Sequence, residues 1–277
     1  MREWEPLLLL VTFVVYMGAT VLLSLRYWLR ADSLITAGLG AMGAGFALHT
    51  GLLVLRALAA GRLPFSNLYE FTLVFAWATL AVYLACTFRW RLLAAAPLVL
   101  AIATVLLGAS AMMGREIRPL MPALRSVWLQ FHVATGLLAY GALAVSAALG
   151  VVAISGVEEA TRRPAGGGIG QYWRMPGKPE LVRYIHGLIV FGFVFLSLLL
   201  VTGAVWAEET WGRWWGWDPK ESWALATWLI YLAYLHGRGR FGWQGEATAW
   251  FSAIGFLAVL FTLFGVTYLL PGLHSYL

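Results

Sequence analysis

Charged side chains are scarce in this sequence. Only 12% of the 277 residues are Asp, Glu, Lys or Arg, which is about half of the share found in soluble domains. Such a chain cannot cover a water-soluble surface. Apolar stretches of about 20 residues, long enough for a helix to cross the hydrocarbon core, recur from end to end. The composition therefore excludes a soluble protein and indicates one that spans a membrane.

Cysteine is almost absent. The single cysteine, Cys86, lies inside an apolar run, which excludes a disulfide framework, a C-x-x-C motif and a cysteine metal cluster. The net charge is +6, but the basic residues stand in short connections between apolar runs, where lipid headgroups are their natural partners. We therefore expect a lipid bilayer, and no nucleic acid, as the partner of this charge.

Apolar runs bounded by Arg, Pro and Gly predict an all-α bundle of eight membrane spans. The first run is long enough to span and is followed by no small-residue cleavage site, so it is interpreted as a span and not as a signal peptide. Residues 1–277 are expected to form a single transmembrane domain. The predicted spans are 5–25, 35–57, 67–87, 92–113, 127–154, 184–206, 220–236 and 247–270.

The distribution of basic residues predicts the orientation. With the N-terminus external, the inner connections hold eleven of the 19 Lys and Arg residues, as the positive-inside rule favours. Both termini are then external, and the connections 114–126 and 207–219 share the external face with the C-terminal tail. The inner residues are Arg26, Arg30, Arg89, Arg91, Arg162, Arg163, Arg174, Lys178, Arg183, Arg238 and Arg240.

The external segment 207–222 is unusually rich in tryptophan. Its four tryptophans, if helical, form one aromatic face. An interfacial aromatic belt is the simplest explanation. A belt does not require glycines between the rings, however, whereas Gly212 and Gly216 allow the backbone to approach a flat ligand closely, and several indoles suit a large macrocycle such as heme. The four are Trp211, Trp214, Trp215 and Trp217.

The sequence Asp218-Pro-Lys-Glu221 is typical of a helix start. Asp is a good N-cap, Pro is favoured at the first helical position, and Glu three residues after the cap completes a capping box. The seventh span is therefore expected to begin here. Its N-terminus and Lys220 favour an anionic group, such as a heme propionate.

The chain has five histidines, and a polar side chain in hydrocarbon needs a partner or a function. His132, in the outer turns of the fifth span, and His274, in the tail, are both external, so their imidazoles can ligate one heme iron from opposite faces. Two interfacial histidines are the alternative. His236 ends the seventh span near the inner face and suggests a second heme site, with His186 or a residue of another subunit as its partner. His49 is expected to be a hydrogen-bonded core histidine.

Several other polar residues are expected at the external ends of spans. Ser66 or Asn67 can cap the third span, with Glu70 in its first turn. The external arginines are expected to be solvated, although any of them can pair with a propionate. They are Arg56, Arg115, Arg118, Arg125 and Arg213.

Residues 211–225, Trp-Gly-Arg-Trp-Trp-Gly-Trp-Asp-Pro-Lys-Glu-Ser-Trp-Ala-Leu, resemble the WWD signature of heme-handling proteins. The form of this motif is more similar to the CcsA (ResC) family than to the tryptophan motifs of the system I proteins. Pro64 to Glu70, Trp128 with His132, Leu235-His236 and Gly272 to Tyr276 also resemble that family, so the likeness covers most of the chain.

The resemblance implies a membrane component of the system II cytochrome c synthase, a heme lyase, in the bacterial inner (plasma) membrane. It implies that His132 and His274 ligate an external heme b, with the Trp segment and Asp218 around it, and that His236 ligates a heme in the membrane. The expected partners are a CcsB (ResB) protein and an apocytochrome c, whose Cys-x-x-Cys-His thiols join the heme vinyl groups. His274, after Gly272, is expected to yield to the incoming histidine.

Two other functions fit the same residues. A heme transporter without synthase chemistry would use the same ligands. A b-type electron-transfer subunit would hold permanent hemes between histidine pairs of a rigid bundle, whereas here one external histidine lies outside any span.

Overall fold

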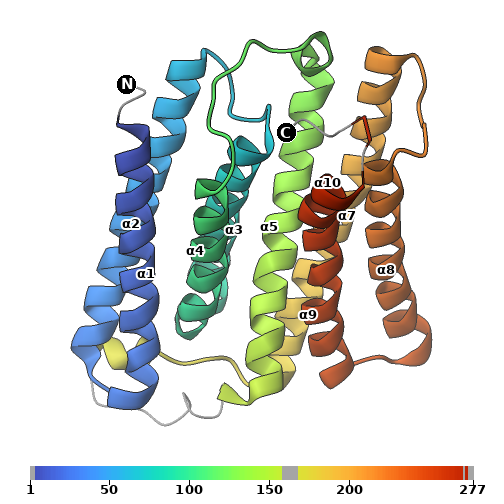
Figure 1. Cartoon of the computed structure of the whole chain (residues 1–277). Helices are drawn as coiled ribbons and strands as arrows, with labels where there is room; N and C mark the ends of the chain where they lie inside the picture. The colour runs from blue at the N-terminus through green and yellow to red at the C-terminus, as the bar shows by residue number, and fades with distance from the viewer. Residues whose placement is uncertain (1–3, 158–167, 271, 274–277) are drawn as a thin grey trace. The chain divides into compact units, whose positions relative to one another are not determined.

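The computed structural model describes residues 4–157, 168–270 and 272–273. Within these residues the chain forms helices joined by short connections and contains no strand. The long helices are α1 (Glu5–Leu29), α2 (Asp32–Ala60), α3 (Leu68–Trp90), α4 (Ala96–Ala111), α5 (Val127–Ser155), α7 (Lys178–Trp211), α8 (Pro219–Phe241) and α9 (Glu246–Leu260) (Figure 1). The last of these continues through a π-helical turn, Phe261–Gly265, into α10 (Val266–Leu269).

Seven of these helical segments are long and apolar enough to cross a membrane. A helix covers each of the eight predicted spans, and the one outside the seven is α8, which is 23 residues long but carries charged residues at both ends. Large apolar side chains such as Val105, Val201 and Leu257 are exposed, as expected where lipid covers the surface. The protein is thus an all-α, multi-pass membrane protein; eight crossings and external termini stay predictions.

The chain divides into two compact units. The first comprises Met1–Pro64, Leu68–Arg115 and Ser155–Leu181, and it holds helices α1 to α4. Helix α2 lies close against α1 because it presents glycines there: a Cβ at Gly38 would come within 2.5 Å of Leu23, and one at Gly45 within 2.6 Å of Tyr16. Small residues of this kind let helix backbones approach one another in membranes.

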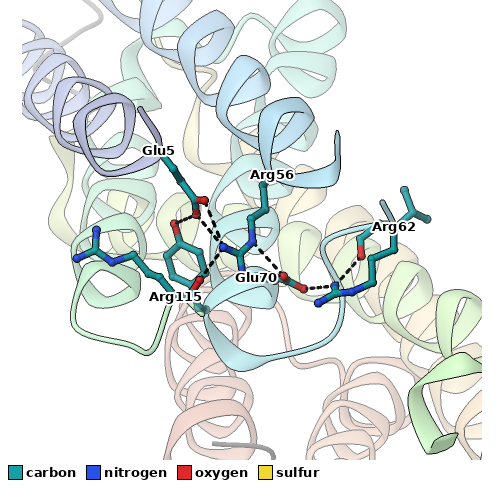
Figure 2. A network of polar contacts seen from close by, with 7 residues as sticks. Glu5, Arg56, Arg62, Glu70 and Arg115 are labelled. Atoms are coloured by element: carbon teal, nitrogen blue, oxygen red, sulfur yellow. Dashed lines mark hydrogen bonds and ion pairs between the residues drawn. The ribbon is translucent and has the colours of Figure 1, made fainter. Parts of the chain in front are cut away.

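A network of buried charges closes one end of this first unit. Figure 2 shows Arg56, near the end of α2, between Glu5 at the start of α1 and Glu70 in the first turn of α3. The Arg56 guanidinium donates to Glu5 Oε1 (3.1 Å), to Glu70 Oε1 (3.0 Å) and to the carbonyl oxygen of Arg115 (2.7 Å). Arg62 donates to Glu70 Oε2 at 2.8 Å. Arg56 is only 1% exposed, so the expectation that it is solvated is wrong.

The second unit comprises Phe65–Asn67, Glu116–Ile154 and Val182–Leu277. Within it, hydroxyl groups connect neighbouring helices. Ser252 of α9 donates to the carbonyl of Ser146 in α5 (3.1 Å), and the Trp228 indole of α8 donates to Ser197 of α7 (2.8 Å). Such bonds satisfy polar groups that lipid cannot. This unit carries all the predicted site residues.

Candidate functional site

His132 lies in the second turn of α5, as predicted, and its ring is hydrogen-bonded to α7. The Nδ1 atom is 2.9 Å from the carbonyl oxygen of Leu199. Because a carbonyl only accepts, this geometry assigns the proton to Nδ1 and the ring lone pair to Nε2. Nε2 is therefore the atom of His132 that can ligate a metal.

The His132 imidazole is also fixed by close packing. A Cβ added at Gly203 of α7 would stand 2.8 Å from both Cε1 and Nδ1 of the ring, so only glycine leaves room for it. One turn further along α7, Trp206 stacks on the imidazole with ring centroids 5.8 Å apart and planes at 26°. The Trp206 indole N–H in turn donates to the carbonyl of Ala123 at 2.8 Å.

The start of α5 is tied to the end of α7. The Ser126 hydroxyl oxygen accepts from the backbone N–H of Trp128 (3.0 Å), which caps α5, and the same hydroxyl donates to the Glu209 carboxylate. Ser126 is only 8% exposed. Together with the His132 bond to Leu199, this contact fixes the start of α5 against the last turns of α7 at two points.

The Trp segment is not a continuous helix, so the single helical aromatic face does not form. Helix α7 ends at Trp211, and no helix runs through residues 212–218. Trp211 packs on Trp206, with ring centroids 5.0 Å apart, and therefore belongs to the cluster beside His132. Trp215 meets Trp217 edge to face at 5.7 Å, and Trp214 and Trp217 are 59% and 71% exposed.

The glycines of this segment have local structural roles. Gly212 ends α7 in the left-handed region, with φ at 69°, a conformation that glycine adopts without strain. Gly216 lies against the Arg213 side chain, because a Cβ there would come within 2.8 Å of Arg213 Nε. A close approach to a flat ligand at these glycines stays a prediction.

The predicted capping box at the start of α8 is confirmed. Asp218 Oδ1 accepts from the backbone N–H of Lys220 (3.1 Å), and Glu221 Oε2 accepts from that of Asp218 (3.2 Å). Glu221 Oε2 also accepts from the N–H of Gly216 at 2.8 Å, so the cap is connected to the Trp segment before it.

The same aspartate contacts the C-terminal tail. The backbone N–H of Leu273 donates to Asp218 Oδ2 at 2.6 Å, and Asp218 is only 6% exposed. The predicted ligand His274, the next residue, lies outside the described residues. The structure thus brings the start of the tail to the end of the Trp segment, and the position of His274 stays a prediction.

The other histidines occupy different surroundings. His236, in the last turns of α8, is exposed and meets the edge of the Phe241 ring at 5.7 Å. His186 of α7 shares a hydrogen bond with the Tyr234 hydroxyl (3.2 Å), and its pairing with His236 is untested. His49 is fully buried, with Nδ1 3.3 Å from the Tyr16 hydroxyl, which confirms a hydrogen-bonded core histidine.

Sequence reasoning missed the groups that orient His132. Its hydrogen-bond acceptor is a backbone carbonyl at Leu199, which no side chain signals. Gly203 and Trp206 stand one turn apart on α7, but both are some 70 residues away from His132 along the chain. Their spacing therefore gave no sign that they contact His132. The bond from Leu273 to Asp218 likewise has no local signal.

Comparison with known proteins identifies the family. A family model described as cytochrome C assembly protein matches residues 65–274, a range that includes every candidate ligand. The cytochrome c biogenesis protein CcsA of Gloeobacter violaceus is 34% identical, over 95% of this chain and 93% of that protein. The chain belongs to the CcsA family. Other CcsA proteins, from Synechococcus sp. (strain JA-3-3Ab) and Chlamydomonas reinhardtii, are 35% and 36% identical, over 100% and 85% of this chain and 96% and 67% of theirs.

A solved structure has the same fold. The cytochrome c heme lyase CcmF matches 95% of this chain with a TM-score of 0.69 and 18% identity. The match covers 46% of the CcmF chain, so the present chain corresponds to about half of that longer protein. At this identity, the likeness concerns the fold alone.

Proposed function

We propose that this protein is the heme-binding membrane component of a system II cytochrome c synthase. It binds heme b as a substrate on the external side of the bacterial plasma membrane, with His132 and His274 as axial ligands and the Trp segment beneath the porphyrin. Together with a CcsB-type partner, it presents the heme vinyl groups to the Cys-x-x-Cys-His motif of an apocytochrome c.

The observation that carries this proposal is the setting of His132. Its Nδ1–H is held by the Leu199 carbonyl, which directs Nε2 to a metal and raises the basicity of the ligand, as at other metal-bound histidines. Its ring stacks on Trp206, the first of the clustered tryptophans. A histidine that only needed a hydrogen bond at an interface would not require Gly203 to clear space for its ring.

The indoles beyond this cluster supply the apolar surface that a porphyrin needs. Trp214 and Trp217 are both more than half exposed, and stacking on such rings binds a flat ligand without covalent commitment. Asp218 is enclosed by backbone donors, so we assign it to the support of the site. Lys220 lies in the first turn of α8, and we assign it as the basic group that pairs with a heme propionate at that helix N-terminus.

The chemistry requires positioning from this chain and nucleophiles from the substrate protein. Addition of each cysteine S–H across one vinyl C=C forms one C–S bond and one C–H bond, with no leaving group and no net electron transfer. Fixed orientation of vinyl and thiol lowers the entropic part of the barrier. The lone Cys86, inside α3, has no part in this reaction.

The inner histidine is assigned to the delivery of heme. His236 is exposed at the end of α8, and the resemblance to the CcsA family implies that its counterpart ligand stands on the partner protein, with no assigned role for His186. We therefore assign the second ligand of an inner heme to the CcsB-type partner, and transfer from this inner site to the outer one completes the proposed route.

The test is heme retention and cytochrome maturation in histidine variants. The chain is coexpressed with its CcsB partner and an apocytochrome c reporter, and the purified complex is examined by its heme absorption spectrum. His132→Ala and His274→Ala are expected to lose most of the external heme and of the holocytochrome, whereas Gln130→Ala, an exposed neighbour on α5, keeps both. Full retention and maturation in both histidine variants would refute the proposal.

The alternative of a heme transporter predicts a different outcome when heme b and apocytochrome are mixed with and without the purified complex, and a vinyl-free heme serves as the control for thioether formation. Mesoheme carries ethyl groups in place of vinyls and cannot form thioethers. A synthase complex is expected to bind mesoheme through the same histidines and to yield no covalent cytochrome with it, whereas heme b gives thioethers when apocytochrome and the purified complex are mixed. Thioether formation at the same rate without the complex would favour transport alone.

A further inference from the structure

The carboxylate of Asp218 has two separate tasks in the structure. One oxygen, Oδ1, caps α8 by accepting from the N–H of Lys220 at 3.1 Å. The other, Oδ2, accepts from the N–H of Leu273 at 2.6 Å. A cap needs only one oxygen, and Ser would supply it as well. The second oxygen therefore connects the C-terminal tail to the Trp segment.

The shape of the tail gives a second, independent observation. A Cβ added at Gly272 would overlap Asp218 Oδ2 and come within 3.0 Å of Pro219 Cδ. The φ of Gly272 is not in the left-handed region, so glycine is required here for close approach and not for backbone conformation. Gly272 thus allows the tail to lie directly on the cap of α8.

The cap itself is fixed to the tryptophans. Glu221 Oε2 accepts from the N–H groups of both Gly216 and Asp218, and Trp217, between them, holds a left-handed φ of 56°. This conformation is costly for a bulky residue and persists only where its neighbours enforce it. A displacement of Asp218 would therefore move Trp217 and the tail together.

We propose that Asp218 is a positioning residue that clamps the C-terminal tail onto the Trp segment and thereby sets the place of His274. The proposal rests on the proposed function, because it takes His274 as a heme ligand. Leu273, the residue held by the clamp, is directly bonded to His274 in the chain. The clamp combines the hydrogen bond from the Leu273 N–H to the Asp218 carboxylate with the close packing of Gly272 on the cap.

This arrangement makes the two external ligands unequal. His132 is part of a helix and is enclosed by Gly203 and Trp206, so its displacement requires α5 and α7 to move apart. Among the described residues, the tail is held at Asp218 by the Leu273 hydrogen bond and the packing of Gly272, so its release requires no separation of helices. The histidine of the incoming Cys-x-x-Cys-His motif therefore replaces His274, and loss of the clamp is expected to speed this exchange.

Two variants separate the clamp from the cap. Asp218→Ser keeps a good N-cap but is too short to reach Leu273. Gly272→Ala leaves Asp218 intact and displaces the tail. Both are expected to transfer heme from the purified complex to apomyoglobin about 10- to 100-fold faster than the unsubstituted protein, the range that follows from losing one hydrogen bond to a charged group. Gly239→Ala, where an added Cβ meets nothing within 4 Å, is the control.

Two further measurements distinguish positioning from a general loss of structure. Hydrogen exchange of the heme-free protein is expected to show faster exchange at the Leu273 amide in Asp218→Ser, with α8 amides beyond the first turn unchanged. Added imidazole is expected to restore the six-coordinate heme spectrum in Asp218→Ser and in His274→Ala, because the missing group is a ligand and not the pocket.

The outcomes separate this proposal from the function on which it rests. Heme loss in His274→Ala with unchanged transfer rates in Asp218→Ser and Gly272→Ala would overturn the clamp and leave the proposed function standing. Full heme retention in His274→Ala would remove the function itself. Faster amide exchange in Asp218→Ser without faster heme transfer would show a tail contact that does not position a ligand, which also overturns the clamp.

Discussion

Replacing Arg56 is expected to cost far more stability than replacing any exposed arginine of this chain. The Arg56→Met change removes a guanidinium that bonds Glu5 at 3.1 Å and Glu70 at 2.9 Å and that is itself 1% exposed. Glu70 keeps Arg62 as its partner, and Glu5 keeps the hydrogen bond from the neutral Tyr69 hydroxyl. Methionine fills the space but leaves buried negative charge uncompensated.

The magnitude follows from the burial of the partners. Removing one member of a buried ion pair costs about 3–5 kcal/mol, because the remaining charge stays out of water. The matched control is Arg118→Met. Arg118 pairs with Glu116 at 3.0 Å, but both side chains are more than 70% exposed, and such a pair contributes about 1 kcal/mol at most.

The assay is denaturant unfolding of the purified protein in detergent, followed by its tryptophan fluorescence. Arg56→Met is expected to lower the free energy of unfolding by several times the loss in Arg118→Met. The double variant Glu5→Gln with Arg56→Met is expected to be more stable than Arg56→Met alone, since it removes one of the uncompensated charges. Equal losses in the Arg56 and Arg118 variants would refute the reasoning.

Two further predictions concern the histidines. Gly203→Ala is expected to weaken external heme binding about tenfold or more, because the added methyl overpacks the His132 ring at a cost of about 1–3 kcal/mol. The measurement is a heme titration, with Gly187→Ala as the control, since an added Cβ at Gly187 of the same helix meets nothing within 4 Å. Equal affinities in the two variants would contradict the packing argument. His236→Ala is expected to abolish the inner heme signal of the complex while His186→Ala preserves it, and the reverse result in heme spectra would place the inner ligand on α7.

Local chemistry allowed much of this fold to be predicted from the sequence. Each predicted span coincides with a helix because long apolar runs in lipid have few other ways to satisfy their backbone groups. The start of α8 was predicted from Asp218 and Glu221, whose capping box depends only on residues three apart in the chain. The interior position of His49 followed from its place in an apolar run.

The structure departs from the sequence-based expectations at two places. The aromatic face expected of a helical Trp segment does not form, because Gly212 takes a left-handed conformation and ends α7, which the spacing of the tryptophans does not reveal. Arg56 was interpreted as solvated because its nearest partner, Glu70, stands on the next helix, and Glu5 stands 51 residues away in the chain. Only the fold brings the compensating charges together.

The two proposed external ligands differ in how they are held. His132 is held by contacts between α5 and α7, so its release requires these two helices to separate locally. The tail is held at Asp218 by contacts of Gly272 and Leu273, which lie outside any helix, so their release requires no helix to move. The proposed function, in which heme is first bound and then released to the cytochrome, is consistent with this inequality: we propose that His132 on the helix sets where the iron lies and that His274 on the tail sets when the product leaves.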